Sequence, residues 1–283
     1  MLGAIIGDIV GSIYEFHNIR TKDFPLFNER CFFTDDTVMT VAVAKAIMAG
    51  GKRDDFIDSM KSYGRRFPKA GYGRGFDRWL KSESRESYNS YGNGAAMRVS
   101  PVAFLVRLHD SPYGLDWLLT RRKVMAVAKR SAEVTHDHPE GINGAQAVAE
   151  AIVYMRVGRE ISKDVPTRRL DLKGLMEDGY GYDMSRSLDE IRLTNNFDPS
   201  CQATVPVAVT AFVESVDFED AIRNAVSVGG DSDTIAAITG SIAQAAYGVP
   251  GPIREKALLY LPKSLLSVVL EAESKMREDY PQA

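Results

Sequence analysis

Two short acidic motifs, far apart in the chain, carry the residues best suited to chemistry. Phe-Thr-Asp-Asp-Thr occupies residues 33–37, and Gly-Gly-Asp-Ser-Asp-Thr occupies residues 229–234. Apolar residues at helical spacing follow each motif, over residues 38–49 and 233–247, so each acid pair is expected at a helix N-terminus. Thr34 is the expected N-cap of the first helix, and the paired glycines allow a tight turn before the second.

Acidic residues at a helix start have a simple alternative role, because Asp and Ser cap free amide groups and complement the positive end of the helix. One capping residue suffices for each helix, however, and both motifs carry two acids with adjacent hydroxyls. Four carboxylates and several hydroxyls form a set of hard oxygen donors, which suits Mg²⁺, Mn²⁺ or Ca²⁺ and not zinc. The paired motifs therefore favour a shared metal centre over capping alone.

Composition and charge place the chain among soluble globular proteins. It has 283 residues, of which 45% are hydrophobic and 26% charged, and its net charge of −3 gives no electrostatic case for nucleic acid as a partner. Two cysteines are too few for a disulfide framework, so a reducing cytoplasm is the expected location. We expect no membrane span, because no run approaches eighteen apolar residues, and the sequence does not predict an oligomeric state.

Helical patterns dominate the rest of the sequence. Residues 1–14 are expected to form a helix, because three glycines spaced four apart give it a smooth face for a close neighbour, and Glu15 falls at its C-terminal end. Residues 16–33 are expected to form a loop, and residues 160–200 to be loosely helical. The other expected helices are Asp54–Phe67, Phe76–Lys81, Ala95–Leu108, Leu115–Val134, Ile142–Val157, Gln202–Glu214, Phe218–Val228, Ile253–Leu259 and Leu265–Arg277. No strand alternation or linker appears, so a single domain over 1–283 is predicted.

Two glycine-rich turns, at residues 70–75 and 90–94, lie between the first helices. Such turns let backbone amides approach a phosphate, and the tyrosine in each, Tyr72 or Tyr91, is placed to stack on a base or ribose. Plain loop punctuation is the alternative for either turn alone. Neither is a Walker loop, since no Gly-Lys-Ser/Thr follows, and neither follows a strand as a dinucleotide fold requires.

Taken together, the motifs resemble those of the ADP-ribosylglycohydrolase family, and the resemblance extends along essentially the whole chain. The matching segments occur in the family's order: Gly-Asp-Ile-Val-Gly-Ser-Ile-Tyr-Glu (7–15), Phe-Thr-Asp-Asp-Thr (33–37), Gly-Tyr-Gly-Arg-Gly (71–75), Gly-Asn-Gly-Ala-Ala-Met-Arg (92–98), Thr-His (135–136) with Asn-Gly-Ala (143–145), and Gly-Gly-Asp-Ser-Asp-Thr (229–234). Each short motif is common by itself. Their complete and collinear occurrence is specific.

The resemblance implies an all-α fold, a single compact orthogonal bundle of many helices, that hydrolyses the link between ADP-ribose and a modified protein side chain or small acceptor. It implies two Mg²⁺ or Mn²⁺ ions that hold the ribose bearing the modified group, and Glu15 and Asp36 as catalytic residues. The implied metal ligands are Thr34, Asp35, Asp36, Asp231, Asp233 and Thr234. The implied substrate-binding residues are Gly71, Tyr72, Gly73, Ser90, Tyr91, Gly92, Asn93, Gly94 and His136.

Alternatives remain open at this point. Glu15 taken alone is as well explained as a surface residue at a helix end, and His136 as a polar residue of a turn. Family members cleave links to arginine, serine, acyl esters or poly(ADP-ribose), and the loops that would choose among them, residues 16–30 and 160–200, have the least readable sequence. The family also includes structural lens proteins, which could dispense with the acids that this chain keeps. A sensor that binds ADP-ribose without turnover is the other alternative.

Overall fold

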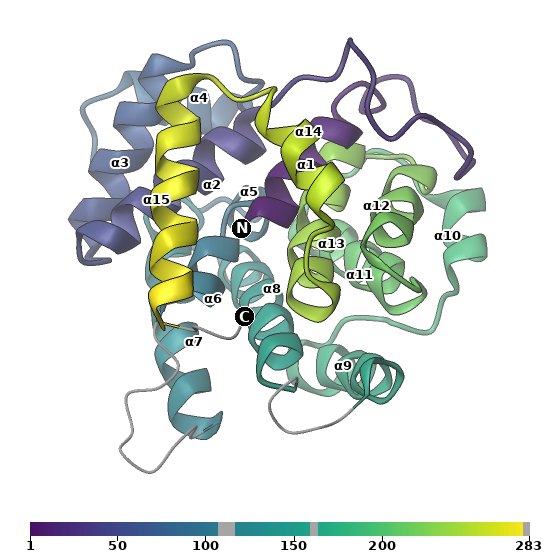
Figure 1. Cartoon of the computed structure of the whole chain (residues 1–283). Coiled ribbons are helices and arrows are strands. Elements are labelled where there is room, and N and C mark those ends of the chain that lie inside the picture. Colours follow the sequence, from purple (N-terminus) through teal and green to yellow (C-terminus); the bar gives the residue numbers. More distant parts are fainter. Residues whose placement is uncertain (107–116, 159–163, 280–283) are drawn as a thin grey trace.

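A computed structural model describes residues 1–106, 117–158 and 164–279, and these residues form helices joined by loops, with no strand among them (Figure 1). The expected all-α fold is therefore confirmed. The helices are α1 (Leu2–Gly11), α2 (Asp35–Ala49), α3 (Arg53–Arg66), α4 (Arg74–Lys81), α5 (Gly94–Met97), α6 (Ser100–Leu105), α7 (Trp117–Glu133), α8 (Pro139–Gly158), α9 (Val165–Tyr180), α10 (Leu188–Thr194), α11 (Cys201–Val213), α12 (Phe218–Ser227), α13 (Ser232–Tyr247), α14 (Gly251–Leu258) and α15 (Lys263–Asp279).

The first helix and α13 pack backbone against backbone in the centre of the molecule. A Cβ atom added to Gly3 would lie 2.0 Å from the Gly240 carbonyl oxygen, and one added to Gly7 would lie 2.0 Å from that of Ala236. Gln244 of α13 also accepts hydrogen bonds from the first amino groups of α1. The spacing of the glycines predicted close approach by a neighbour, and α13 is that neighbour. This approach brings the acids of the two helices together.

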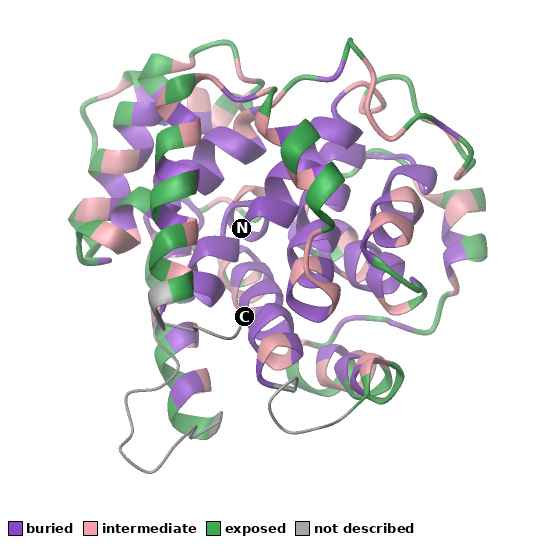
Figure 2. Cartoon of the chain, viewed as in Figure 1, coloured by how far each residue is buried: buried purple, intermediate pink, exposed green. Residues whose placement is uncertain are grey.

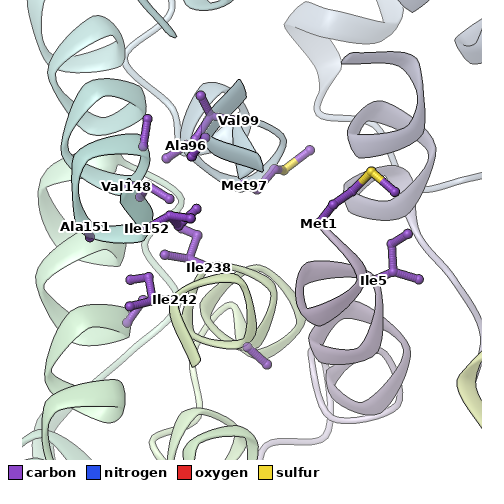
Figure 3. Packing of buried hydrophobic residues seen from close by; sticks show 14 of the residues in the cluster. Met1, Ile5, Ala96, Met97, Val99, Val148, Ala151, Ile152, Ile238 and Ile242 are labelled. Carbon is purple, nitrogen blue, oxygen red and sulfur yellow. The ribbon is translucent and has the colours of Figure 1, made fainter. Parts of the chain in front are cut away.

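Helix α13 lies in the middle of the hydrophobic core. Figure 3 shows its residues Ile238 and Ile242 between α1, which contributes Ile5, and α8, which contributes Val148 and Ile152. Helices α11 and α12 also pack against α13. Figure 2 shows the consequence for exposure, because α1 and α13 are buried along their length while the outer helix α15 keeps an exposed face. The two helices α1 and α13, which supply part of the site described below, are therefore both deeply buried.

The prediction of one continuous helix over Ala95–Leu108 is wrong. The chain instead forms the short helices α5 and α6, with Pro101 in the first turn of the second, and Leu108 lies outside the described residues. Proline has no amide proton and its ring clashes with the carbonyl four residues earlier, so Pro101 favours the start of a new helix with the proline in its first turn. Of the loosely helical stretch 160–200, residues 160–163 lie outside the described residues, and the remainder forms α9, α10 and their connecting loops.

The expected loop over residues 16–33 is confirmed, and the other helix predictions agree with the structure to within a few residues. The expected start at Leu115 lies outside the described residues. In the part of the chain that the structure describes, no helix has both the length and the apolar character needed to cross a bilayer. Cys31 and Cys201 are both buried and unpaired.

Candidate metal centre and substrate cavity

The N-terminus of α2 is capped without the use of its paired acids. The hydroxyl of Thr34 accepts a hydrogen bond from the Asp36 amide at 3.3 Å. The carboxylate of Asp8, which comes from α1, accepts from the Thr34 amide at 2.9 Å, the Thr34 hydroxyl at 2.7 Å and the Thr37 amide at 3.0 Å. Thr34 is therefore the cap, as predicted, and Asp8 is a second cap supplied from another helix. The carboxylates of Asp35 and Asp36 are free for another role.

At the start of α13, as at the start of α2, an acidic side chain is not used to cap the helix. Gly229 and Gly230 have φ values of +64° and +76°, which glycine adopts without strain, and they turn the chain into the helix. Asp231 occupies the N-cap position but its side chain makes no capping hydrogen bond. Its carboxylate accepts instead from the side-chain amide of Asn93 at 2.7 Å. The simple capping explanation of these acids does not account for Asp231.

The two acidic helix starts meet in the folded chain. Thr234 donates a hydrogen bond from its hydroxyl to Asp36 Oδ2 at 3.1 Å. Ligand atoms of Asp8, Asp36 and Asp233 lie within 4.8 Å of one another, as do those of Glu15, Asp231 and Asp233. Among the described residues, the remaining oxygen of Asp36, Oδ1, has no hydrogen-bond partner although it is buried. An all-oxygen cluster with an unsatisfied buried carboxylate oxygen fits a hard divalent cation.

Burial and mutual repulsion hold the protons of this cluster unusually tightly when no cation is bound. Burial raises the pKa of Asp35 to about 8, with the charges of Asp8 and Asp231 adding to the effect. Burial likewise raises the pKa of Glu15 to about 7, aided by Asp231 and Asp8. The pKa values of Asp36 and Asp233 lie well above the usual range, again through burial first and neighbouring carboxylates second. A cation would relieve this repulsion.

A cavity of about 400 Å³ opens over the acidic cluster. It is lined by Glu15, by the acids of α2 and α13, and by the two glycine turns. Gly71 needs its glycine, since its φ is +106° and an added Cβ would lie 3.3 Å from Asp35 Oδ1. Gly73 also lines the cavity, whereas Tyr72 does not, and packs against Phe76 with ring centroids 5.5 Å apart.

The second glycine turn is held in place by the segment that leads into α11. The Asn93 amide donates to the Pro199 carbonyl at 2.7 Å, and the Ser90 hydroxyl accepts from the Gly92 amide at 3.2 Å. Ser90, Gly92, Asn93 and Gly94 all line the cavity. Tyr91 does not line it. This side chain is 55% exposed, and its ring lies edge-on to His138.

His136 lines the cavity beside the second glycine turn, together with a residue that the sequence did not single out. Arg98 lines the cavity, is only 1% exposed, and has no ion pair among the described residues. Burial lowers the pKa of Arg98 to about 10 and, with the charge of Arg98, lowers that of His136 well below its usual range. The lining of the cavity thus includes both the acidic cluster and a buried cation.

Asp8 and Arg98 are the site residues that sequence reasoning missed. Both stand in quoted motifs, but only the unusual placement of a charge inside an apolar helix could have flagged them, since Asp8 interrupts the apolar run of α1 and Arg98 follows the run Ala-Ala-Met. A charged side chain in such a place is almost never fully buried unless it has a partner. Asp8 finds that partner at the start of α2.

A comparison with protein families identifies the chain. The sequence model of the ADP-ribosylglycohydrolase family matches residues 1–279. The chain belongs to the ADP-ribosylglycohydrolase family. The whole-chain resemblance seen in the motifs is thereby confirmed, and membership in this family supports glycosyl hydrolase activity.

Several relatives within the ADP-ribosylglycohydrolase family are similar over most of their length. The mouse (Mus musculus) ADP-ribosylhydrolase ARH3 is 26% identical over 320 residues, which cover 88% of this chain and 83% of that protein. The ADP-ribosylarginine hydrolase Tri1 of Serratia proteamaculans is 25% identical, with 90% of this chain and 73% of that protein covered. A solved structure of an ADP-ribosylglycohydrolase-related protein complex covers 97% of both chains with a TM-score of 0.65 at 22% identity, which supports the fold.

Proposed function

We propose that this protein is a divalent-metal-dependent hydrolase that releases ADP-ribose from a modified protein side chain or a small acceptor. The observation that carries the proposal is the carboxylate cluster between α2 and α13, because its acids are not consumed by capping and Asp36 Oδ1 is buried without a partner. The residues proposed to hold two Mg²⁺ or Mn²⁺ ions are Thr34, Asp35, Asp36, Asp231, Asp233 and Thr234. Such ions, when bound, orient ribose hydroxyls and lower the pKa of a bound water.

The charge distribution along the cavity supports an orientation for ADP-ribose. In the proposed orientation the ribose that bears the modified group contacts the acids, and the diphosphate lies near Gly94, Arg98 and His136, which also line the cavity. Gly92 and Gly94 present backbone close to the ligand without a side chain in the way. Because Tyr72 and Tyr91 do not line the cavity, we assign them no contact with the diphosphate and place Tyr91 only within reach of the outer ribose or base.

Glu15 is the proposed general acid and base. It lies in the turn after α1 and lines the cavity beside the acids of α13, half-buried, where a carboxyl group can exchange a proton with a water or with the leaving group. Asn18 holds this turn in place, since its side-chain amide donates to the carbonyls of Glu15 and Gly230, both at 3.0 Å. The position of Glu15 is therefore tied to the loop that begins the second acidic motif.

Three exposed phenylalanines form the proposed contact surface for the departing group. Phe16, Phe32 and Phe197 line the cavity at its open side and are 78%, 52% and 53% exposed. Phe16 follows the proposed catalytic Glu15. Phe197 follows Asn196, whose carbonyl oxygen would lie 2.9 Å from a Cβ atom added to Gly230. Exposed aromatic side chains beside a catalytic group are suited to contact the side chain or peptide that carries the modification.

A multiple-turnover assay tests the function. Purified protein is incubated with Mg²⁺, Mn²⁺ or EDTA and with arginine-, serine- and ester-linked ADP-ribose, and free ADP-ribose is measured. Hydrolysis of at least one substrate, lost in EDTA and restored by metal, is expected. Tight binding of ADP-ribose with no turnover of any substrate would instead identify a sensor. We also propose one domain over residues 1–283, since the hydrophobic core cluster includes residues from Met1 to Ala272.

A further inference from the structure

The imidazole of His136 is held from one side and open to the cavity on the other. Its Nδ1 lies 2.8 Å from the hydroxyl oxygen of Thr135. Its Nε2 faces the second glycine turn, where a Cβ atom added to Gly94 would lie 3.1 Å away and one added to Gly92 3.9 Å away. The ring is 4% exposed and lines the cavity. The proton on this ring therefore decides whether the cavity wall presents a donor or an acceptor.

Arg98 determines how the Thr135 hydroxyl is used. A guanidinium can only donate hydrogen bonds, and Arg98 Nη2 donates to Thr135 Oγ1 at 2.8 Å. The hydroxyl oxygen is thus an acceptor toward Arg98, and its own proton needs another acceptor. Among the described residues, its remaining hydrogen-bond partner is His136 Nδ1. The oxygen could accept a second hydrogen bond, but the buried proton would then have no acceptor among the described residues. The arrangement that satisfies this proton has the hydroxyl donating to Nδ1, which then carries no proton.

We propose, on the basis of the proposed function, that Arg98 and Thr135 are positioning residues that fix His136 as the neutral tautomer protonated on Nε2, which donates a hydrogen bond to a diphosphate oxygen of ADP-ribose. Because a neutral imidazole has one proton, an unprotonated Nδ1 requires a protonated Nε2. The Nε2–H group then points toward the side of the cavity where Gly94 has no side chain. His136 is a fixed donor in this arrangement and takes no part in proton transfer.

The first test measures the tautomer in the free protein. The chain has four histidines, so a long-range ¹H–¹⁵N spectrum of histidine-labelled protein is simple, and His136→Gln assigns the signals. The parent protein should show the Nε2–H pattern for His136 at pH 7. Thr135→Val removes the hydroxyl and should change this pattern toward a mixture of tautomers, whereas Thr135→Ser should restore it. An Nδ1–H or doubly protonated ring in the parent, or an unchanged spectrum in Thr135→Val, overturns the proposal.

The second test measures ADP-ribose affinity by calorimetry. Loss of one oriented hydrogen bond predicts that Thr135→Val and His136→Leu weaken binding about 3- to 10-fold. Thr135→Ser should stay within about 2-fold of the parent, and His136→Gln, whose amide can donate from near the Nε2 position, should lie closer to the parent than His136→Leu. Gly94→Ala adds a methyl group 3.1 Å from Nε2 and should weaken binding in the same range, with the tautomer unchanged.

Failure of this inference differs from failure of the proposed function. If the parent binds no ADP-ribose, the proposed function is wrong, and the donation to ADP-ribose is wrong with it, while the spectrum still decides the tautomer. If the parent binds ADP-ribose and Thr135→Val binds it equally well, the positioning role is wrong and the proposed function stands. Thermal unfolding of each variant separates these results from loss of the fold.

Discussion

Metal binding to the acidic cluster should release protons and should tighten as pH rises. With pKa values of about 8 for Asp35 and about 7 for Glu15, these groups are about nine-tenths and one-half protonated at pH 7 in the absence of metal. Asp36 and Asp233, with pKa values well above their usual range, add to the protons held. Since a bound cation requires ionised carboxylates, at least about one proton leaves per protein, and affinity should rise about tenfold per pH unit near pH 7.

The stability of the metal-free protein should change with pH in the opposite direction. A carboxyl whose pKa is higher in the folded state than in the unfolded state binds more protons when the protein is folded. For Asp35, the stabilising contribution to the free energy of unfolding is present below the unfolded pKa of about 4. It is lost as the pH rises toward the folded pKa of about 8. The melting temperature in EDTA should therefore fall between pH 5 and pH 8. Saturating Mg²⁺ or Mn²⁺ should stabilise the protein more at pH 8 than at pH 6.

Two measurements check this reasoning. Calorimetric titration with Mn²⁺ in buffers of different ionisation enthalpy counts the released protons, and thermal unfolding with EDTA or metal from pH 5 to pH 9 gives the stability. Asp36→Asn serves as the comparison, since it removes one titrating group and should reduce the proton release. Metal affinity that is independent of pH, or a metal-free melting temperature that rises from pH 6 to pH 8, would refute the idea of a protonated cluster that the cation must ionise.

Three further predictions concern single residues. Asp36→Asn and Asp233→Asn should each abolish most hydrolysis, and the double variant should lose little more, because the ligands act as a unit; an unchanged rate in either single variant contradicts this. Glu15→Gln should keep its affinity for ADP-ribose while turnover falls about 10²- to 10⁴-fold. Calorimetry measures the affinity and steady-state kinetics the turnover. An equal loss of affinity and turnover would contradict the proton-transfer role of Glu15. Gly7→Ala should lower the free energy of unfolding in urea by about 3 kcal/mol, since the added Cβ would lie 2.0 Å from the Ala236 carbonyl oxygen. Gly174→Ala in α9 is the control. Its added Cβ would meet no neighbouring atom within 4 Å, and it should raise the free energy of unfolding by about 0.5–1 kcal/mol.

The sequence predicted the helices and the two acidic starts because both depend on local patterns. Thr34 is a cap because a hydroxyl, two acids and an apolar run follow one another directly. The glycines of α1 also have a local signature, their spacing of four. The break between α5 and α6 also has a local signature, Pro101 in the first turn of the second helix.

The remainder of the site could not be predicted, since it depends on residues distant in the chain. The capping of α2 by Asp8 uses an acid from another helix, and the bond from Arg98 to Thr135 joins two segments whose relative position no periodicity reveals. The position of Tyr91 depends in the same way on a residue distant in the chain, His138, whereas Tyr72 packs against Phe76, four residues further on. Adjacency in a motif predicted a shared turn, and it did not predict which side chains reach the cavity.

The packing of α1 and α2 with α13 also determines at which stage of synthesis the chain could bind a cation. During synthesis the first acidic pair leaves the ribosome long before residues 229–234 exist, so the early chain offers only half of the donor set. The glycine face of α1 likewise waits for α13, its partner in the core. The proposed donor set is therefore complete only after residues 229–234 have joined α1 and α2, and a cation at 100 times its Kd would add about 2.7 kcal/mol to the stability of the folded chain. Under the proposed function, metal supply would act on the folded protein and not on its early folding.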